Sequence, residues 1–214
     1  MASLLDGLEG TTIAPLERLN VRQYHAMIST GILREGAPIE LIDGLLVQKD
    51  RRDHGGALMT VGPKHAFTVR LVFQILMSIS EGLDCFAQSQ QPVTLNETNE
   101  PEPDVSLILG HMDDYSERHP GPADVALICE VADTSLFFDR GKKCAIYASS
   151  GIPEYWIVDL QNRKIDVFKN PVSTEEVYSS HTVFKNNDKI ELIVLNNRFE
   201  ISVNEILPPL KTEK

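Results

Sequence analysis

Four charged residues lie inside or beside apolar segments, where side chains of this kind can act in catalysis. Glu40 lies in the run IELI, and Asp104 immediately precedes VSLIL. Glu130 lies inside VALICEVA, and Lys143 follows on a helical segment. Mg²⁺ prefers oxygen ligands, and two carboxylates from adjacent strands can hold it with several waters. A bound metal can turn water into a nucleophile, and a lysine can position that water. The four residues therefore predict metal-dependent hydrolysis of a phosphodiester bond, with Asp104 and Glu130 as the metal ligands.

Each carboxylate also has a simpler interpretation. A carboxylate inside an apolar strand is unfavourable to bury unless a cation accompanies it, so Glu130 could form a buried ion pair with an arginine or lysine. Asp104 follows Pro103 and could be an ordinary turn or capping residue. Glu40 could face solvent, because successive residues of a strand point to opposite faces. Residue type alone leaves both interpretations open.

The helical segment after Glu130 carries Asp139, Lys143 and Tyr147 at four-residue spacing, so the three share one helix face. That face either looks into the site or carries a surface ion pair and a packing aromatic. Lys142 points about 100° away from Lys143 on a helix, so the two lysines cannot both enter one site. His65, in the first turn of a long predicted helix, is a further accessory candidate that could contact a phosphate or the attacking water.

The elements that must position these residues follow from periodicity and turn signals. A short helix is predicted at 21–30 after Asn20, and a hairpin is predicted at 39–48 around Asp43-Gly44. A polar loop at 49–62 then leads into a long helix that starts at Pro63 and ends before Gly82. Another helix is predicted at 139–150. The remaining apolar runs are predicted strands, at 85–95, 105–109, 125–132, 154–160, 164–170, 176–184, 189–195 and 198–202.

This order predicts a mixed α/β (α+β) fold. A central mixed sheet is expected to be flanked by helices, with an antiparallel strand extension at its C-terminal end. The runs 105–109 and 125–132 are apolar throughout, which is typical of strands buried on both faces, so we expect them to be neighbours in the sheet. A length of 214 residues suits one domain, which we place at 18–206 between a flexible segment at 1–17 and a tail at 207–214.

Composition and missing motifs limit the cellular location and the functions that the sequence is compatible with. The three cysteines are odd in number and widely spaced, which favours reduced thiols and a cytoplasmic location. No apolar run approaches the roughly 20 residues that a membrane-spanning helix needs. The motifs GxxxxGK[ST] and GxGxxG are absent, so a nucleotide cofactor is not expected. The net charge of −11 is unusual for a protein that binds DNA phosphates, although positive and titratable groups gather between Arg51 and His65.

The chain also resembles a known family over roughly Val21 to Phe168. The ordered series IELIDGLLVQ, Lys64-His65, EPDVSLIL and LICEVADTSLFFDRGKKCAIYASSGIPEYWIVD is similar to the restriction-endonuclease-like family, long catalogued as a domain of unknown function, of the PD-(D/E)XK nuclease superfamily. The most specific part of the series is Glu130-Val131 followed by Asp139, Lys143 and Tyr147 and then GIPEYWIVD.

The resemblance implies a restriction-endonuclease-like core and a Mg²⁺-dependent endonuclease, with Mn²⁺ as another suitable metal and DNA as the substrate. Asp104 takes the place of the aspartate of the Pro-Asp element, and Glu130 takes the place of the acidic residue of (D/E)XK. The sequence departs from that pattern at Ala132, where the superfamily has its lysine, and Lys143 on the following helix is the replacement. Glu40 is then an additional acidic group near the metal, and Asp139 is an accessory residue.

Two further expectations accompany this hypothesis. A homodimer is expected, because enzymes that cut both DNA strands often pair two sites, an analogy at the level of fold. A non-catalytic protein-interaction module on the same fold, again as a homo-oligomer, is the alternative, and the acidic balance and the displaced lysine favour it. RNA and small phosphoesters remain open as substrates.

Overall fold

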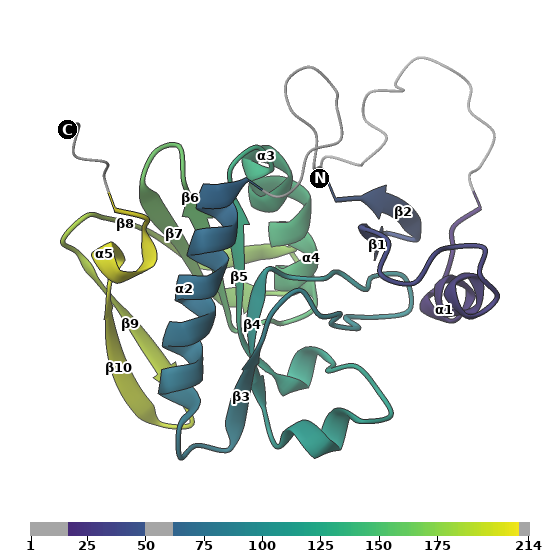
Figure 1. The fold of residues 1–214 in the computed structure, drawn as a ribbon, viewed down its shortest axis with the longest axis horizontal. Coiled ribbons are helices and arrows are strands. Elements are labelled where there is room, and N and C mark those ends of the chain that lie inside the picture. Colours follow the sequence, from purple (N-terminus) through teal and green to yellow (C-terminus); the bar gives the residue numbers. More distant parts are fainter. Residues whose placement is uncertain (1–16, 50–61, 210–214) are drawn as a thin grey trace.

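The apolar runs of the sequence assemble into a six-stranded mixed sheet with helices on both faces (Figure 1). A computed structural model describes residues 17–49 and 62–209. The strand order is β3-β4-β5-β6-β7-β8, and every neighbouring pair is antiparallel except β5 and β6. The strands are β3 (Cys85–Gln88), β4 (Val105–Leu109), β5 (Val125–Ala132), β6 (Glu154–Asp159), β7 (Lys164–Val172) and β8 (Val177–Lys185).

A helical crossover joins the one parallel pair, because parallel neighbours cannot be linked by a tight turn. The crossover runs through α3 (Leu136–Phe138), a π-helical turn at Asp139–Lys143 and α4 (Cys144–Ser149). In the sheet, β5 is flanked by β4 and β6 and is buried along nearly its whole length. The two most apolar strands, β4 and β5, are neighbours, as their composition predicts.

Each face of the sheet has its own apolar core. On one face, α2 (Pro63–Ser80) packs with α5 (Val203–Ile206) and with the separate antiparallel hairpin of β9 (Lys189–Val194) and β10 (Asn197–Ser202). On the other face, the crossover helices and the loops before β4 pack against even-numbered residues of β5 such as Ile128. Figure 1 shows α2 in front of the strands and α4 behind them. Among the described residues, no helix is both long and apolar enough to cross a bilayer.

A small N-terminal unit lies beside the sheet (Figure 1). It comprises α1 (Val21–Ser29), β1 (Ile39–Ile42) and β2 (Leu45–Gln48). Asn20 caps α1, since its side chain accepts the Gln23 N–H while the Gln23 side chain accepts the Asn20 N–H. Asp43 and Gly44 have φ angles of 51° and 70°, as a two-residue turn of this hand requires. Backbone hydrogen bonds between Leu41 and Glu100 join β1 to the link before β4.

Most predicted elements are confirmed, and three boundaries are corrected. The strand predicted at 85–95 ends at Gln88, because the backbone leaves the extended conformation at Gln90, where φ is 53°, and Pro92 follows. The helix predicted from Asp139 begins at Leu136 and contains the π-helical turn. The strand predicted at 176–184 extends the central sheet as β8, so the separate C-terminal pair is β9 and β10. Residues 50–61 of the predicted loop, and most of the predicted terminal segments 1–17 and 207–214, lie outside the described residues.

The hairpin turn provides a test of how the N-terminal unit is held. A Cβ atom at Gly44 would lie 2.6 Å from Arg18 Cβ and 2.7 Å from the Leu19 carbonyl oxygen. Gly44→Ala is therefore expected to lose about 1–2 kcal/mol from the left-handed backbone and about 1–3 kcal/mol more from overlap. Gly82→Ala is the matched control, because Gly82 has φ +75° with no described heavy atom within 4 Å of the added carbon. Urea unfolding midpoints measure both variants, and equal losses would contradict the close packing at Gly44.

Candidate active site

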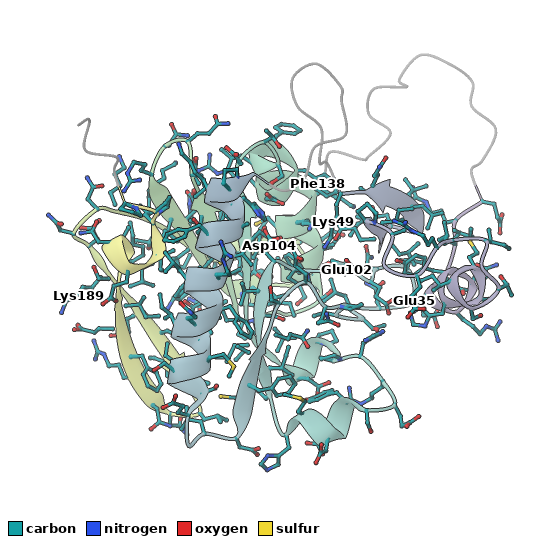
Figure 2. All side chains as sticks on the ribbon, in the orientation of Figure 1. Glu35, Lys49, Glu102, Asp104, Phe138 and Lys189 are labelled. Atoms are coloured by element: carbon teal, nitrogen blue, oxygen red, sulfur yellow. The ribbon has the colours of Figure 1, made fainter. Side chains whose placement is uncertain are left out.

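The strand register brings Asp104 and Glu130 together. Val105 of β4 pairs with Cys129 of β5, so the next pair along the ladder places Asp104 opposite Glu130. The Asp104 N–H donates to Glu130 Oε2 at 3.3 Å, and the Val131 N–H donates to Asp104 Oδ2 at 2.9 Å. Figure 2 shows Asp104 beside α2 in the middle of the molecule. The two carboxylates predicted as metal ligands are therefore neighbours that hydrogen bonds to the backbone hold in place.

Lys143, which belongs to the crossover, contacts Glu130 of β5. Its Nζ is 2.9 Å from Glu130 Oε1, and Tyr147 donates its hydroxyl to the same oxygen at 2.9 Å. The π-helical turn that ends at Lys143 and the start of α4 thus present the lysine and the tyrosine on one face, as their spacing predicts. Lys142 points elsewhere, to an ion pair with Asp43 in the hairpin turn. The choice of Lys143 over Lys142 agrees with this geometry.

Glu40 reaches the same lysine from the N-terminal hairpin. Its Oε1 lies 3.2 Å from Lys143 Nζ, while its Oε2 accepts the Glu102 N–H at 3.1 Å. Only 2% of Glu40 is exposed. The interpretation of Glu40 as a solvent-facing strand residue is therefore wrong, and this side chain bridges β1, the link before β4 and the crossover.

The side chains of Glu40, Asp104, Glu130 and Lys143 form a cluster, and the two accessory candidates lie beside it. His65 of α2 places Nε2 3.1 Å from Asp104 Oδ2, so its described contact is with a carboxylate of the site. Its other ring nitrogen, Nδ1, is buried without a hydrogen-bond partner among the described residues. Asp139 is buried, and its Oδ2 accepts the Ser135 hydroxyl. All six predicted site residues thus come together from five parts of the fold: β1, the link before β4, β5, α2 and the crossover.

The cluster carries more negative than positive charge in a buried place. Three of its carboxylates are at least 96% buried, namely Glu40, Glu130 and Asp139, and Lys143 is 5% exposed. Two buried acids elsewhere have a lysine or arginine partner: Glu154 has Lys169 and the Trp156 ring N–H, and Asp166 has Arg140 and His181. Here Lys143 and a titratable histidine serve four carboxylates, which is the deficit of positive charge that a bound cation would fill.

The pKa values of the carboxylates differ because their surroundings differ. Burial raises the pKa of Glu130 to about 7, with Asp104 and Asp139 adding to the rise and Lys143 opposing it. Burial likewise raises the pKa of Asp139 to about 6. For Asp104 burial acts in the same direction, but the hydrogen bonds from His65 and Val131 outweigh it and hold the pKa below its usual value.

The pKa values of the two basic groups, Lys143 and His65, are both raised. Burial lowers the pKa of Lys143, but its carboxylate neighbours, Glu130 first, raise it well above the ordinary value. The pKa of His65 is raised although burial opposes the charge, because Asp104 accepts its hydrogen bond. Carboxylate attraction therefore exceeds the effect of burial at both groups.

The donor set suits Mg²⁺ by its chemistry. It consists of carboxylate oxygens from adjacent strands, which hard cations prefer, and it contains no sulfur. Asp104 Oδ1 receives no hydrogen bond from the described residues, and Glu130 is more basic than an ordinary carboxylate. Asp104 and Glu130 therefore fit the role of metal ligands, which stays a prediction.

Two contacts of the site were not assigned from the sequence. The sequence is compatible with a packing role or a site-facing role for Tyr147, and its hydroxyl contacts Glu130. Ser135, which donates to Asp139, belongs to a polar link that gave no signal of its own. The spacing of Tyr147 from Lys143 was the available signal for the tyrosine, because four residues return to the same helix face.

Comparison with known proteins agrees with this fold. Residues 21–204 match the Uma2 family, whose description is "Putative restriction endonuclease". A crystal structure from Anabaena variabilis, titled as a putative nuclease belonging to DUF820, matches with a TM-score of 0.63 and 15% sequence identity, over 83% of this chain and 94% of that chain. None of the curated proteins matches. The structural match confirms the nuclease-like fold, and the family match covers most of the chain. The chain belongs to the Uma2 family of putative restriction endonucleases.

Proposed function

We propose that this protein is a Mg²⁺-dependent endonuclease that hydrolyses DNA phosphodiester bonds, with Mn²⁺ able to replace Mg²⁺. The observation that supports the proposal is a largely buried cluster in which Lys143 pairs with Glu130 and Glu40 and interacts electrostatically with Asp104 and Asp139. The family that the chain belongs to is described as "Putative restriction endonuclease". Structural ion pairs tend to balance charge, whereas this cluster has an excess of acid that favours a bound cation.

Asp104 and Glu130 would hold the metal, which supplies Lewis-acid stabilisation of the phosphate and lowers the pKa of a bound water. The raised pKa of Lys143 keeps its ammonium group protonated, so the lysine orients water and stabilises negative charge as a hydrogen-bond donor. Tyr147 and Glu40 fix the positions of Glu130 and Lys143 through the contacts described above. His65 holds Asp104 Oδ2, which leaves Oδ1 as the ligand oxygen.

DNA is the proposed substrate even though the chain is strongly acidic. Phosphate contacts depend on local positive charge, and Lys64 is exposed in the first turn of α2 beside His65. Arg51 and Arg52 precede this turn in the sequence but lie outside the described residues. A homodimer, which would pair two sites for cutting both strands, is part of the proposal.

The net charge of −11 specifically favours a second candidate, a non-catalytic interaction module on the same fold. The two candidates differ in what the carboxylate cluster does. A nuclease needs the cluster to bind a divalent cation, whereas an interaction module needs it only to fold. Metal binding and strand cleavage measured on the same samples therefore separate them.

The main test combines calorimetry with plasmid nicking. Wild-type protein is expected to bind Mg²⁺ or Mn²⁺ and to nick supercoiled DNA. Asp104→Asn and Glu130→Gln are each expected to weaken metal binding and to slow nicking at least about a hundredfold, because each loses a ligand charge. Asp113→Asn, in an exposed turn, is the control for removing one negative charge. Metal binding without cleavage of DNA would redirect the search to RNA and small phosphoesters, and absence of both activities would favour the interaction module.

The role of the lysine is tested by substituting the two neighbouring lysines. Lys143→Met keeps the length of the side chain and removes the ammonium group next to Glu130, so turnover should fall about 10²- to 10⁴-fold while metal still binds. Lys142→Met removes only the pair with Asp43 and should cleave at close to the wild-type rate. Single-turnover nicking at saturating Mg²⁺ measures both variants. Equal rates would exclude Lys143 from the catalytic step.

The raised pKa of Glu130 predicts a pH-dependent effect of the metal. Its pKa moves from 4.5 to about 7 on folding, so in metal-free protein the ionised form becomes less favourable and stability declines as pH rises through this range. Mg²⁺ binds the ionised carboxylate, so the increase in Tm on adding Mg²⁺ should be larger near pH 8 than near pH 5.5. In Glu130→Gln the increase should be small at both pH values. Thermal melts with Mg²⁺ and with EDTA give the comparison.

A further inference from the structure

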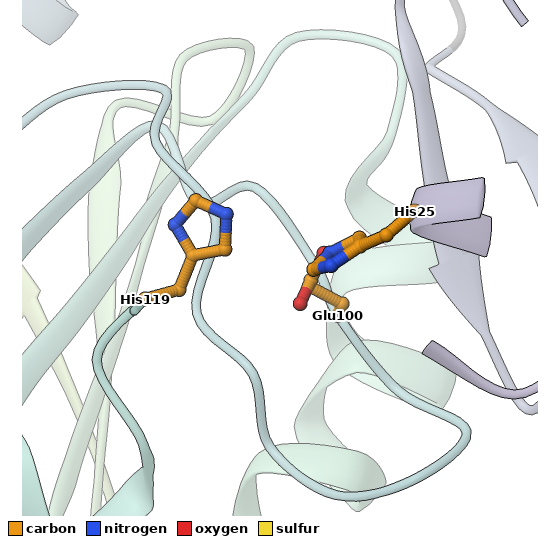
Figure 3. A group of neighbouring side chains, drawn as sticks. All are labelled: His25, Glu100 and His119. Atoms are coloured by element: carbon orange, nitrogen blue, oxygen red, sulfur yellow. The ribbon is translucent and has the colours of Figure 1, made fainter. Parts of the chain in front are cut away.

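A second group of metal-ligating side chains lies outside the candidate active site. It consists of His25, Glu100 and His119, and Figure 3 shows the two imidazole rings on either side of the carboxylate. One ligand atom from each residue lies within 4.8 Å of the others. The three come from separate segments: α1, the link between β3 and β4, and the link between β4 and β5. A ligand held by all three would tie these segments together.

Glu100 is the buried member of the triad. Its side chain is 1% exposed, its Oε2 accepts the Thr94 hydroxyl at 2.6 Å, and its Oε1 lies 2.5 Å from His25 Nε2. Within residues 17–49 and 62–209, no lysine or arginine forms a salt bridge with Glu100. A buried carboxylate needs a positive partner, and here the two neighbours that could supply or hold one are imidazoles.

The backbone fixes the three residues in position. Glu100 exchanges two hydrogen bonds with Leu41 of β1, at 2.8 and 3.3 Å. The Thr94 N–H donates to the carbonyl of Pro120, the residue after His119, at 2.9 Å. Thr94 therefore connects the carboxylate and the histidine segment, in the way that hydrogen-bonded neighbours orient metal ligands. Next to His25, the Tyr24 hydroxyl anchors α1 by donating to the Ile39 carbonyl at 2.8 Å.

The donor set indicates which metal would bind. Two imidazole nitrogens and one carboxylate oxygen suit Zn²⁺ and the neighbouring first-row divalent ions, whereas Mg²⁺ prefers oxygen ligands alone. With metal–ligand bonds of about 2 Å, tetrahedral donors lie about 3.3 Å apart. The rings of His25 and His119 have centroids 5.8 Å apart, and both histidines are exposed, so the ligand atoms must move closer than their present separation of up to 4.8 Å to bind one ion.

We propose that His25, Glu100 and His119 form a second metal site that binds Zn²⁺, with a water molecule as the fourth ligand. The ion clamps α1 to the two links that flank β4. One of these links continues from Glu100 to Asp104, and the β1 residue that pairs with Glu100 is adjacent to Glu40. The bound ion therefore fixes segments that carry two carboxylates of the candidate active site. The metal-site proposal does not depend on nuclease activity.

The test measures Zn²⁺ binding by calorimetry on the full chain without a histidine tag. Apart from one wild-type sample measured for comparison, all samples carry Asp104→Asn and Glu130→Gln, so that the candidate active site contributes as little as the chain allows. We expect one Zn²⁺ per chain in this background, and His119→Ala is expected to weaken binding at least about a hundredfold, since it removes a direct ligand. His111→Ala is the matched control, because His111 lies in the same link with its side chain 80% exposed and is outside the triad. It should bind like the background protein.

Co²⁺ provides a readout of the ligand geometry. The background protein and His111→Ala should show the visible absorption bands of four-coordinate Co²⁺, and His119→Ala should not. His25→Gln should reproduce the loss. The proposal is overturned if His119→Ala binds Zn²⁺ like the background, or if no variant binds at micromolar concentrations. It is also overturned if Zn²⁺ binds only when Asp104 and Glu130 are intact, since the ion would then belong to the candidate active site.

Discussion

The ammonium group of Lys143 is the interaction on which the candidate site depends. It is buried, and a buried charge without a partner would be strongly destabilising. Its partners come from different elements: Glu130 from the centre of the sheet and Glu40 from the N-terminal hairpin. The crossover, the sheet and the hairpin must therefore meet at one point for the lysine to be satisfied. One ion-pair network thus specifies both the arrangement of the chain and the arrangement of the carboxylates.

The parts of the fold that could be predicted from sequence are those with strong local signals. The turn at Asp43-Gly44, the helix that begins at Pro63 and the apolar strand that contains Glu130 each combine residue type with periodicity, and each is confirmed. The end of β3 was not predicted, because it coincides with a left-handed backbone at Gln90, a conformation for which glutamine gives no sequence signal. The π-helical turn has no local signal that distinguishes it from an α-helix.

For the site, sequence indicated which residues come together but not through which contacts. The assignment of Asp104 and Glu130 to one site rests on their places at two strands that were expected to be adjacent. The assignment of Lys143 rests on the family resemblance and on helix spacing. The contact of His65 with Asp104 depends on how the first turn of α2 approaches the sheet, which is a tertiary property. The triad of His25, Glu100 and His119 was not found from the sequence for the same reason, since 75 residues separate its first two members.

Placing the lysine on the crossover instead of on β5 changes how the site responds to thermal motion. Ala132 of β5 is buried and packs in the apolar core, so the sheet carries no charged residue there. The ammonium group is carried instead by the crossover, whose residues Ile146 and Tyr147 are buried in the core on one face of the sheet. The lysine keeps its position only while the crossover stays packed on the sheet, so the assembly of the site depends on the same packing that stabilises the domain.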